Sequence, residues 1–193
     1  MTTDFKIVEE PKKPISMHPK KFAMWLFIGS VAMLFAAFTS AYIVRQAEGN
    51  WLYFDLPNLF YVTSCIILLS SFTLQWAYWE AKKDNLDRVK LLVGITFFLG
   101  VAFLVGQVMA WSELVDHSVY LVGNPSGSFI YILTGLHGAH LISGIAFLLI
   151  VLNSTFKFKI HSKNLAQMEM CLTYWHFLGG LWLYLFVFLI LYR

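Results

Sequence analysis

Charged residues are scarce in this sequence. Asp, Glu, Lys and Arg make up 13% of its 193 residues, whereas apolar residues make up 59%. A soluble domain usually has about a quarter charged and about half apolar residues. A soluble core of this size could not bury so much apolar surface, so the composition indicates an integral membrane protein.

Two further features are missing. Cysteine occurs only at Cys65 and Cys171, which we expect near opposite ends of two membrane spans, too far apart for a disulfide. We therefore predict two buried thiols. Residues 1–21 contain lysines but no short apolar segment followed by a cleavage site, so we predict no removable signal peptide and expect the first apolar run to direct insertion.

Five apolar runs are each long enough to cross a hydrocarbon layer as a helix, which takes about 20 residues. None alternates as the strands of a membrane barrel do. The sequence therefore predicts an all-α fold: a segment of residues 1–21, then one transmembrane domain over residues 22–193. Its helices are predicted at residues 22–44, 59–79, 91–111, 129–152 and 170–192.

The basic residues predict the orientation of these helices. All but two of the 14 Lys and Arg residues, Arg45 and Arg193, lie in the N-terminal segment or in the second and fourth loops. Lys and Arg concentrate on the cytoplasmic side of membrane proteins. We therefore predict a cytoplasmic N-terminus and a C-terminus on the opposite side. This topology also accounts for the net charge of +3 without a nucleic-acid partner.

Carboxylates are absent from the middle of the predicted spans. All 11 acidic residues lie in loops, in the N-terminal segment or within about a turn of a span's end. Ion and proton pathways are usually marked by carboxylates at bilayer depth, and transporters often by two matching half-repeats. Neither is present, which argues against a pump or transporter. The polar residues that we single out inside the spans are Gln107, Thr134, His137, His140 and His176.

Small residues recur at helical spacing in two spans. The positions are Ala32, Ala36 and Ser40 in the first, and Ala102, Gly106 and Ala110 in the third. Such stripes let helix backbones approach closely in lipid. We expect both stripes to mark helix contacts in a compact bundle.

The histidines allow more than one interpretation. His137 and His140 share a helix face, and imidazole binds copper, iron and zinc, but no Cys or carboxylate completes the three or four ligands of a protein metal site. A haem held by His140 or His137 together with His176 is the alternative. At about 1.5 Å per residue, His140 and His176 differ in depth by about 9 Å, which argues against it. We favour hydrogen bonds between helices or to lipid headgroups.

Two motifs connect the sequence to a known family. The segment Thr134-Gly135-Leu136-His137-Gly138-Ala139-His140, followed by Gly144, precedes Tyr174-Trp175-His176-Phe177 with Trp182 six residues after the histidine. In this order and spacing they resemble the Thr-Gly-x-His-Gly-x-His and Tyr-Trp-His-Phe motifs of subunit III of the haem-copper cytochrome c oxidases, in the short bacterial form with five helices. The first helix around Trp25 and Met33, and Gln107 with Trp111, are also similar to that family.

Three positions depart from the family pattern. Val31 and Ala110 stand where the family usually has Glu, and Gly179 where it usually has Asp. Each departure removes a carboxylate, which argues against a proton relay in this chain.

The resemblance implies a non-catalytic subunit of the bacterial inner membrane. It would contact subunit I, with subunit II and other respiratory-complex subunits as further partners, and hold phospholipids. Haem and copper would lie on partner subunits, with no metal or cofactor on this chain, and the complex would reduce oxygen to water while pumping protons. A subunit III of a quinol oxidase, or a haem-binding membrane cytochrome, are the alternatives. The residues expected to contact lipid or other helices are Gln107, Trp111, Thr134, His137, Gly138, His140, Trp175, His176 and Trp182.

Overall fold

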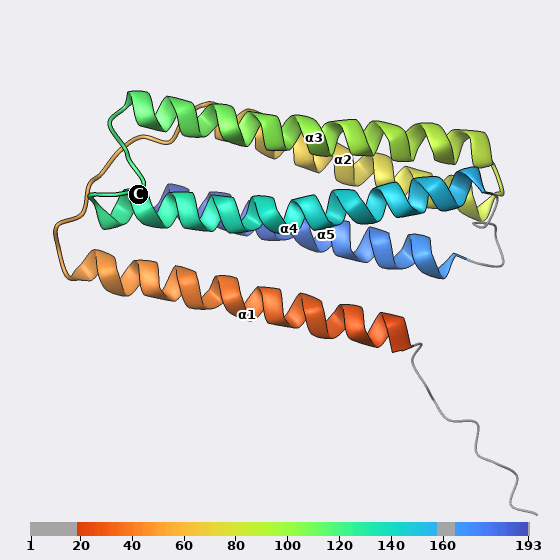
Figure 1. The fold of residues 1–193 in the computed structure, drawn as a ribbon, viewed down its shortest axis with the longest axis horizontal. Coiled ribbons are helices and arrows are strands. Elements are labelled where there is room, and N and C mark those ends of the chain that lie inside the picture. Colours follow the sequence, from red (N-terminus) through yellow and green to blue (C-terminus); the bar gives the residue numbers. More distant parts are fainter. Residues whose placement is uncertain (1–18, 158–164, 193) are drawn as a thin grey trace, which may run out of the picture.

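The computed structural model describes residues 19–157 and 165–192, and over these residues the chain forms five α-helices and no strand (Figure 1). This confirms the all-α prediction, and each helix is long and apolar enough to cross a membrane. The helices are α1 (Pro19–Ala47), α2 (Leu59–Lys82), α3 (Leu86–Asp116), α4 (Pro125–Phe156) and α5 (Ala166–Tyr192).

Most of these helices run a few residues beyond their predicted limits. The backbone hydrogen-bond ladder does not need to stop where the apolar run stops, because polar side chains at the interface remain compatible with a helix. Most of the predicted N-terminal segment, together with Lys159, Lys163 and Arg193, lies outside the described residues.

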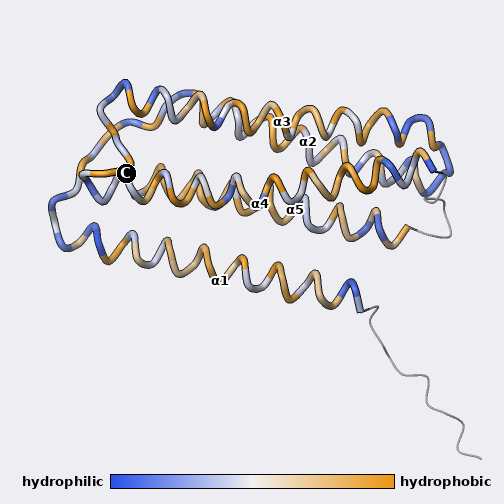
Figure 2. The backbone as a smooth tube through the Cα atoms, in the orientation of Figure 1, coloured by the Kyte–Doolittle hydropathy of each residue, from blue (hydrophilic) through white to orange (hydrophobic). Residues whose placement is uncertain are grey.

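Each helix runs antiparallel to the one before it in the chain, so every second connection lies at the same end of the bundle (Figure 1). One end carries the start of α1, the turn from α2 to α3, the end of α4 and the start of α5, and we call it the lysine-rich end. Its described basic residues are Lys20, Lys21, Lys82, Lys83, Arg88, Lys90 and Lys157. Figure 2 shows hydrophilic positions towards both ends of the bundle. The cytoplasmic location of the lysine-rich end stays a prediction.

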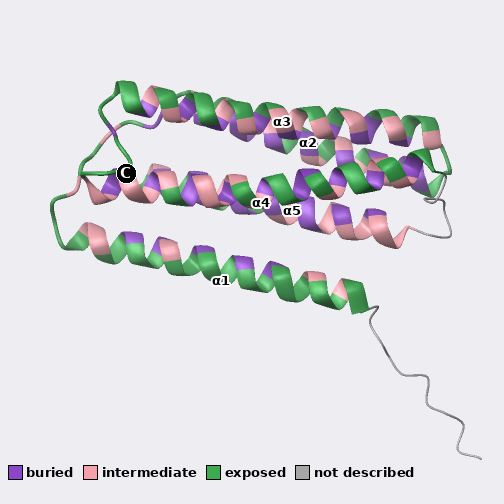
Figure 3. Cartoon of the chain, in the orientation of Figure 1, coloured by how far each residue is buried: buried purple, intermediate pink, exposed green. Residues whose placement is uncertain are grey.

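Helix α5 is central and α1 is peripheral. Helix α5 packs on α1, α2 and α4, and half (50%) of its most apolar stretch is buried. Within the described chain α1 packs only on α4 and α5, and only 22% of its apolar stretch is buried. Figure 3 shows the resulting exposed outer face of α1. One long helix side is therefore left to lipid or to another protein.

A buried carboxylate fixes the turn from α2 to α3. Glu80 is only 3% exposed, and its Oε2 accepts a hydrogen bond from Asn85 Nδ2 at 2.8 Å. Lys83 Nζ and Arg88 Nη1 lie 3.6 and 3.5 Å from its two oxygens. The charge is buried with partners, as a buried charge must be, and it holds the two helices of this pair at the lysine-rich end.

Two expectations fail against the structure. Ala32, Ala36 and Ser40 are exposed, so the stripe on α1 is not buried in a helix contact within this chain. For the stripe on α3 the predicted helix contact is correct only in part: Ala110 is buried and Gly106 approaches Thr63 closely, but Ala102 is exposed. Cys171 is buried as predicted, whereas Cys65 faces outwards from α2. Composition alone does not show which side of an apolar helix meets its neighbours.

Candidate functional site

His137 lies at the centre of the bundle and is fully buried (0% exposed). Aromatic rings from three other helices surround it. The ring centroids of Phe35 on α1, Phe103 on α3 and Trp182 on α5 lie 6.5, 5.9 and 5.2 Å from its imidazole. We call these four residues the His137 layer. Through Phe35, α1 contributes a fully buried ring to this layer.

Three tryptophans join pairs of helices through hydroxyl groups. The indole N–H of Trp182 donates to Ser64 at 2.9 Å, that of Trp175 to Ser70 at 3.0 Å, and that of Trp111 to Thr134 at 3.0 Å. Each hydroxyl in turn donates to a carbonyl of its own helix, at Phe60, Ile67 and Ile130, at 2.6 to 2.7 Å. The hydroxyl thus uses its hydrogen locally and its lone pair across the helix contact.

Gln107 makes the same type of contact. Its Nε2 donates to Thr63 Oγ1 at 3.0 Å, and Thr63 donates to the Phe60 carbonyl at 3.1 Å. Helix α2 therefore presents acceptors to α3 and to α5 from adjacent positions, Thr63 and Ser64. In a lipid environment such bonds stabilise helix pairs by about 0.6 to 2 kcal/mol each.

His140 lies one turn from His137 and packs against aromatic rings of α1. Its Nδ1 is 2.7 Å from the Leu136 carbonyl, an acceptor, so Nδ1 carries the proton. Its ring lies 6.3 and 5.8 Å from those of Phe27 and Phe35. Nearby, the hydroxyls of Ser143 and Tyr174 are 2.7 Å apart and link α4 to α5.

His176 lies elsewhere, against α2. Its Nε2 is 3.1 Å from Gln75 Oε1, across the contact between α5 and α2. Of the three histidines that the sequence predicts as candidates, His137 and His140 therefore share a contact with Phe35, whereas His176 lies apart from them against α2. Among the described residues no cluster of three or more His, Cys, Asp or Glu side chains could hold a metal ion.

Two glycines leave space for large side chains of α5 in the core. A Cβ atom at Gly100 would lie 2.8 Å from Trp175 Cη2, and one at Gly144 would lie 2.8 Å from Leu178 Cδ1. Gly138, which the sequence singled out, is less constrained, because a Cβ atom there would meet Leu104 at an ordinary 3.8 Å. The close approaches therefore occur at Gly100 and at Gly144, which follows the motif, rather than at Gly138.

The three positions that depart from the family pattern all face the interior. Val31 is 3% exposed, Ala110 is fully buried, and Gly179 is buried with Ser71 Oγ 3.1 Å from the place of a Cβ atom. A carboxylate at any of them would point into the bundle, so their replacement makes this core less polar.

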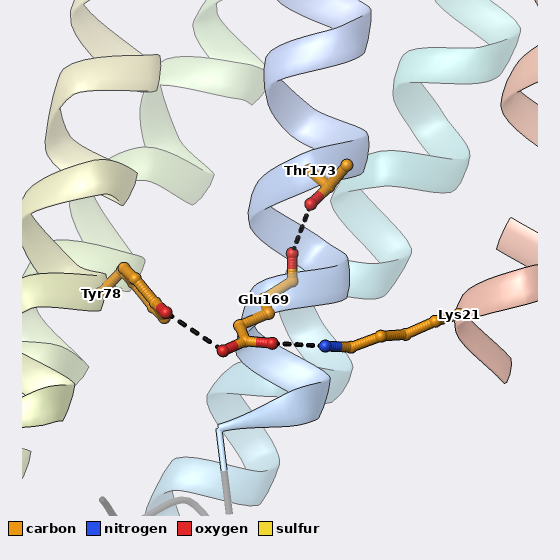
Figure 4. A network of polar contacts seen from close by, with 4 residues as sticks. All are labelled: Lys21, Tyr78, Glu169 and Thr173. Carbon is orange, nitrogen blue, oxygen red and sulfur yellow. Dashed lines mark hydrogen bonds and ion pairs between the residues drawn. The ribbon is translucent and has the colours of Figure 1, made fainter. Parts of the chain in front are cut away.

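An ion pair ties α1 to the bundle at the lysine-rich end (Figure 4). Lys21 Nζ lies 2.6 Å from Glu169 Oε2, and Tyr78 donates to Glu169 Oε1 at 3.1 Å. Thr173 donates to the Glu169 backbone carbonyl at 2.9 Å. One carboxylate on α5 thereby connects α1 and α2.

Two grooves flank α1 towards the opposite end. The groove against α4 has a volume of about 880 Å³ and is lined by Ala37, Ser40, Ala41 and Phe129, with Arg45 at its rim. The groove against α5, of about 550 Å³, is lined by Ile43, Leu183, Tyr184 and Val187 among others. Both are mostly apolar and open, as a site for a lipid chain would be.

Reasoning from the sequence missed the partners of the predicted residues. Ser64, Ser70, Thr63 and Gln75 all lie on α2, and all four receive or make a contact with a candidate residue. Their spacing over one side of an apolar helix was the available signal. Hydroxyls are common in such helices, because they can bond to their own backbone, and this hides those that also serve a second helix.

Comparison with known proteins places the chain in a family. The family model of cytochrome c oxidase subunit III matches residues 12–193. Cytochrome c oxidase subunit 3 of Bacillus sp. (strain PS3) is 27% identical over 172 residues, covering 86% of this chain and 83% of that protein. Cytochrome bo(3) ubiquinol oxidase subunit 3 of Buchnera aphidicola subsp. Baizongia pistaciae is 28% identical over 173 residues, covering 87% of this chain and 89% of that protein. The chain, with its five spans and the His137 layer between them, belongs to the cytochrome c oxidase subunit III family.

Proposed function

We propose that this chain is a structural subunit of a haem-copper terminal oxidase that takes electrons from cytochrome c, and that it works by contact with subunit I and by retaining phospholipid. Its family makes it a multi-pass subunit of a haem-copper oxidase in a bacterial inner membrane. Electron donor, non-catalytic role and direct partner are the proposed parts. The observation that carries the non-catalytic role is a core built from neutral interhelical contacts.

The surroundings of the histidines support a role without a redox centre. Bis-histidine haem ligation would need two imidazoles that face each other across one space. His140 instead faces Phe27 and Phe35, and His176 is bonded to Gln75 on α2. Haem and copper are accordingly assigned to partner subunits, and none to this chain.

The exposed side of α1 supports contact with subunit I. In lipid, an apolar surface alone does not distinguish a protein contact from a lipid contact, but small residues do, because they allow close backbone approach. Ala32, Ala36 and Ser40 are exposed on α1, which also exposes large side chains such as Met33, whereas the outer faces of α2 and α3 carry Phe72 and Phe98. We assign Ala32 and Ala36 to the contact with the partner and the outer faces of α2 and α3 to lipid. Ser40 lies where this contact would meet the groove against α4.

The grooves beside α1 support lipid retention. An acyl chain can fill the apolar part of the larger groove. Arg45 lines this groove and forms an exposed ion pair with Glu48, which a lipid phosphate would have to replace as the partner of the guanidinium. The lipid would then lie beside α1 rather than within the His137 layer, which leaves no room for one.

The electron donor of the oxidase has two candidates, cytochrome c and a quinol. The similar relatives include both cytochrome c oxidase and ubiquinol oxidase subunits, with nearly equal identity. We choose cytochrome c because the motif resemblance is to that form, and keep the quinol oxidase as the second candidate. Subunit II and other respiratory-complex subunits are the further partners that we propose.

Purification of the oxidase with and without this subunit tests the proposal. We expect subunit I to co-purify with the tagged chain in mild detergent. A complex that lacks the chain should keep its haem spectrum and its initial rate but lose activity sooner during turnover, with less bound phospholipid. Iron or copper bound stoichiometrically to the isolated chain would contradict the non-catalytic role. Oxidation of ubiquinol but not of reduced cytochrome c would select the second candidate.

A further inference from the structure

Two polar side chains in the core lack the hydrogen bonds that their burial requires. His137 is 0% exposed and Gln107 is 3% exposed. Within the described parts of the chain, no protein group is in hydrogen-bonding range of His137 Nδ1, His137 Nε2 or Gln107 Oε1. Buried polar atoms are nearly always paired with protein or with ordered water, and a lipid surrounding offers no bulk water as a substitute.

The orientation of the Gln107 amide is fixed by its neighbour. Thr63 uses its single hydrogen on the Phe60 carbonyl, so its lone pair must accept from Gln107, which requires Nε2 on that side. Oε1 is then an acceptor that points away from Thr63. Whatever satisfies it must be a donor.

The two residues lie at the same depth. Helices α3 and α4 are antiparallel. Trp111 of α3 contacts Thr134 of α4 nearer one end of the bundle, and Leu104 of α3 lies next to Gly138 of α4 nearer the other end. Gln107 and His137 fall between these two contacts. Gln107 is also one turn from Phe103, whose ring lies 5.9 Å from that of His137.

We propose that an ordered internal water occupies this level, donates a hydrogen bond to Gln107 Oε1 and exchanges one with a ring nitrogen of His137. Water fits because it can donate and accept at once, and because a neutral imidazole presents one donor and one acceptor. A buried water typically makes two to four such bonds. A cation would find one amide oxygen and one imidazole with no carboxylate, which is a poor ligand set. The water would connect α2, α3 and α4 through Thr63, Gln107 and His137.

A map of the purified oxidase complex at a resolution that shows ordered solvent tests this directly. We expect a density peak within about 2.7 to 3.2 Å of both Gln107 Oε1 and one ring nitrogen of His137. Two results would overturn the proposal. One is a His137 ring turned so that it donates straight to Gln107, and the other is a dry level with the imidazole N–H directed at the face of Trp182.

Coupling between the two residues gives a second, independent measurement. We expect Gln107→Leu and His137→Phe each to lower the thermal unfolding midpoint of the intact complex, and the double variant to lower it by less than the sum, because both remove the same water. Gln75→Leu is the matched control, since it removes an amide that bonds His176 directly. Its effect should add to that of His137→Phe. Additivity of Gln107→Leu with His137→Phe would refute the shared water.

Discussion

At the scale of single residues, the position of Trp175 imposes a steric constraint on the neighbouring helix α3. This side chain is 1% exposed, its N–H is held by Ser70, and its ring passes within 2.8 Å of the place of a Cβ atom on Gly100. The indole cannot move away without breaking its hydrogen bond. Position 100 therefore has to be glycine for a reason of space, although its backbone is an ordinary helix.

Gly100→Ala should consequently destabilise the protein. Forcing one methyl group against a fixed ring costs about 1 to 3 kcal/mol, and we expect a lower unfolding midpoint of the purified complex. Gly94→Ala is the control on the same helix, since a Cβ atom there meets nothing within 4 Å. Equal midpoints for the two variants would show that Trp175 relaxes freely.

At the scale of helices, the sequence predicted which segments cross the membrane but not how they face one another. Length and apolarity fix a span, and all five predicted spans are helices in the structure. Which side of each helix meets its neighbours is harder to predict. These helices are apolar on every side, so no polar face marks the outside. The α1 stripe shows the consequence: its spacing predicted a contact, yet Ala36 is exposed within this chain.

The candidate residues show the same limit. The motif around His137 and the Tyr-Trp-His-Phe segment identified side chains of which His137, Thr134, Trp175 and Trp182 are buried in the core. Their hydroxyl partners Ser64 and Ser70 remained unrecognised. A contact between helices depends on the pairing of two surfaces, and one sequence shows each surface separately.

The attachment of α1 can be tested at this scale through its ion pair with α5. Lys21 and Glu169 are each about one third exposed, so their pair should contribute no more than about 1 kcal/mol. We expect Glu169→Gln to leave the unfolding midpoint nearly unchanged but to speed amide hydrogen exchange in the first turns of α1. Glu48→Gln, which breaks a pair with Arg45 at the other end of α1, should leave those amides unaffected. Unchanged exchange in the Glu169 variant would show that ring contacts alone hold the start of α1.

At the scale of the whole molecule, the bundle is asymmetric in a way that matters for assembly. Helices α2 to α5 bury much of one another, whereas α1 rests on α4 and α5 and leaves one long side uncovered. A helix that contributes so little to its own chain's core, yet brings Phe35 into the His137 layer, is well placed to connect this layer to a neighbouring subunit.

This asymmetry predicts where a bulky side chain should disturb the oxidase. Ala36→Phe fills the α1 stripe that we assign to subunit I, and in a close helix contact the added ring must push the backbones apart. We expect less subunit I to co-purify with the variant, while the isolated chain keeps its unfolding midpoint. Val108→Phe adds a ring to an exposed position on α3, where lipid can yield, and should leave co-purification unchanged. If Val108→Phe, rather than Ala36→Phe, released subunit I, then the partner would pack on α3 and the α1 stripe would face lipid.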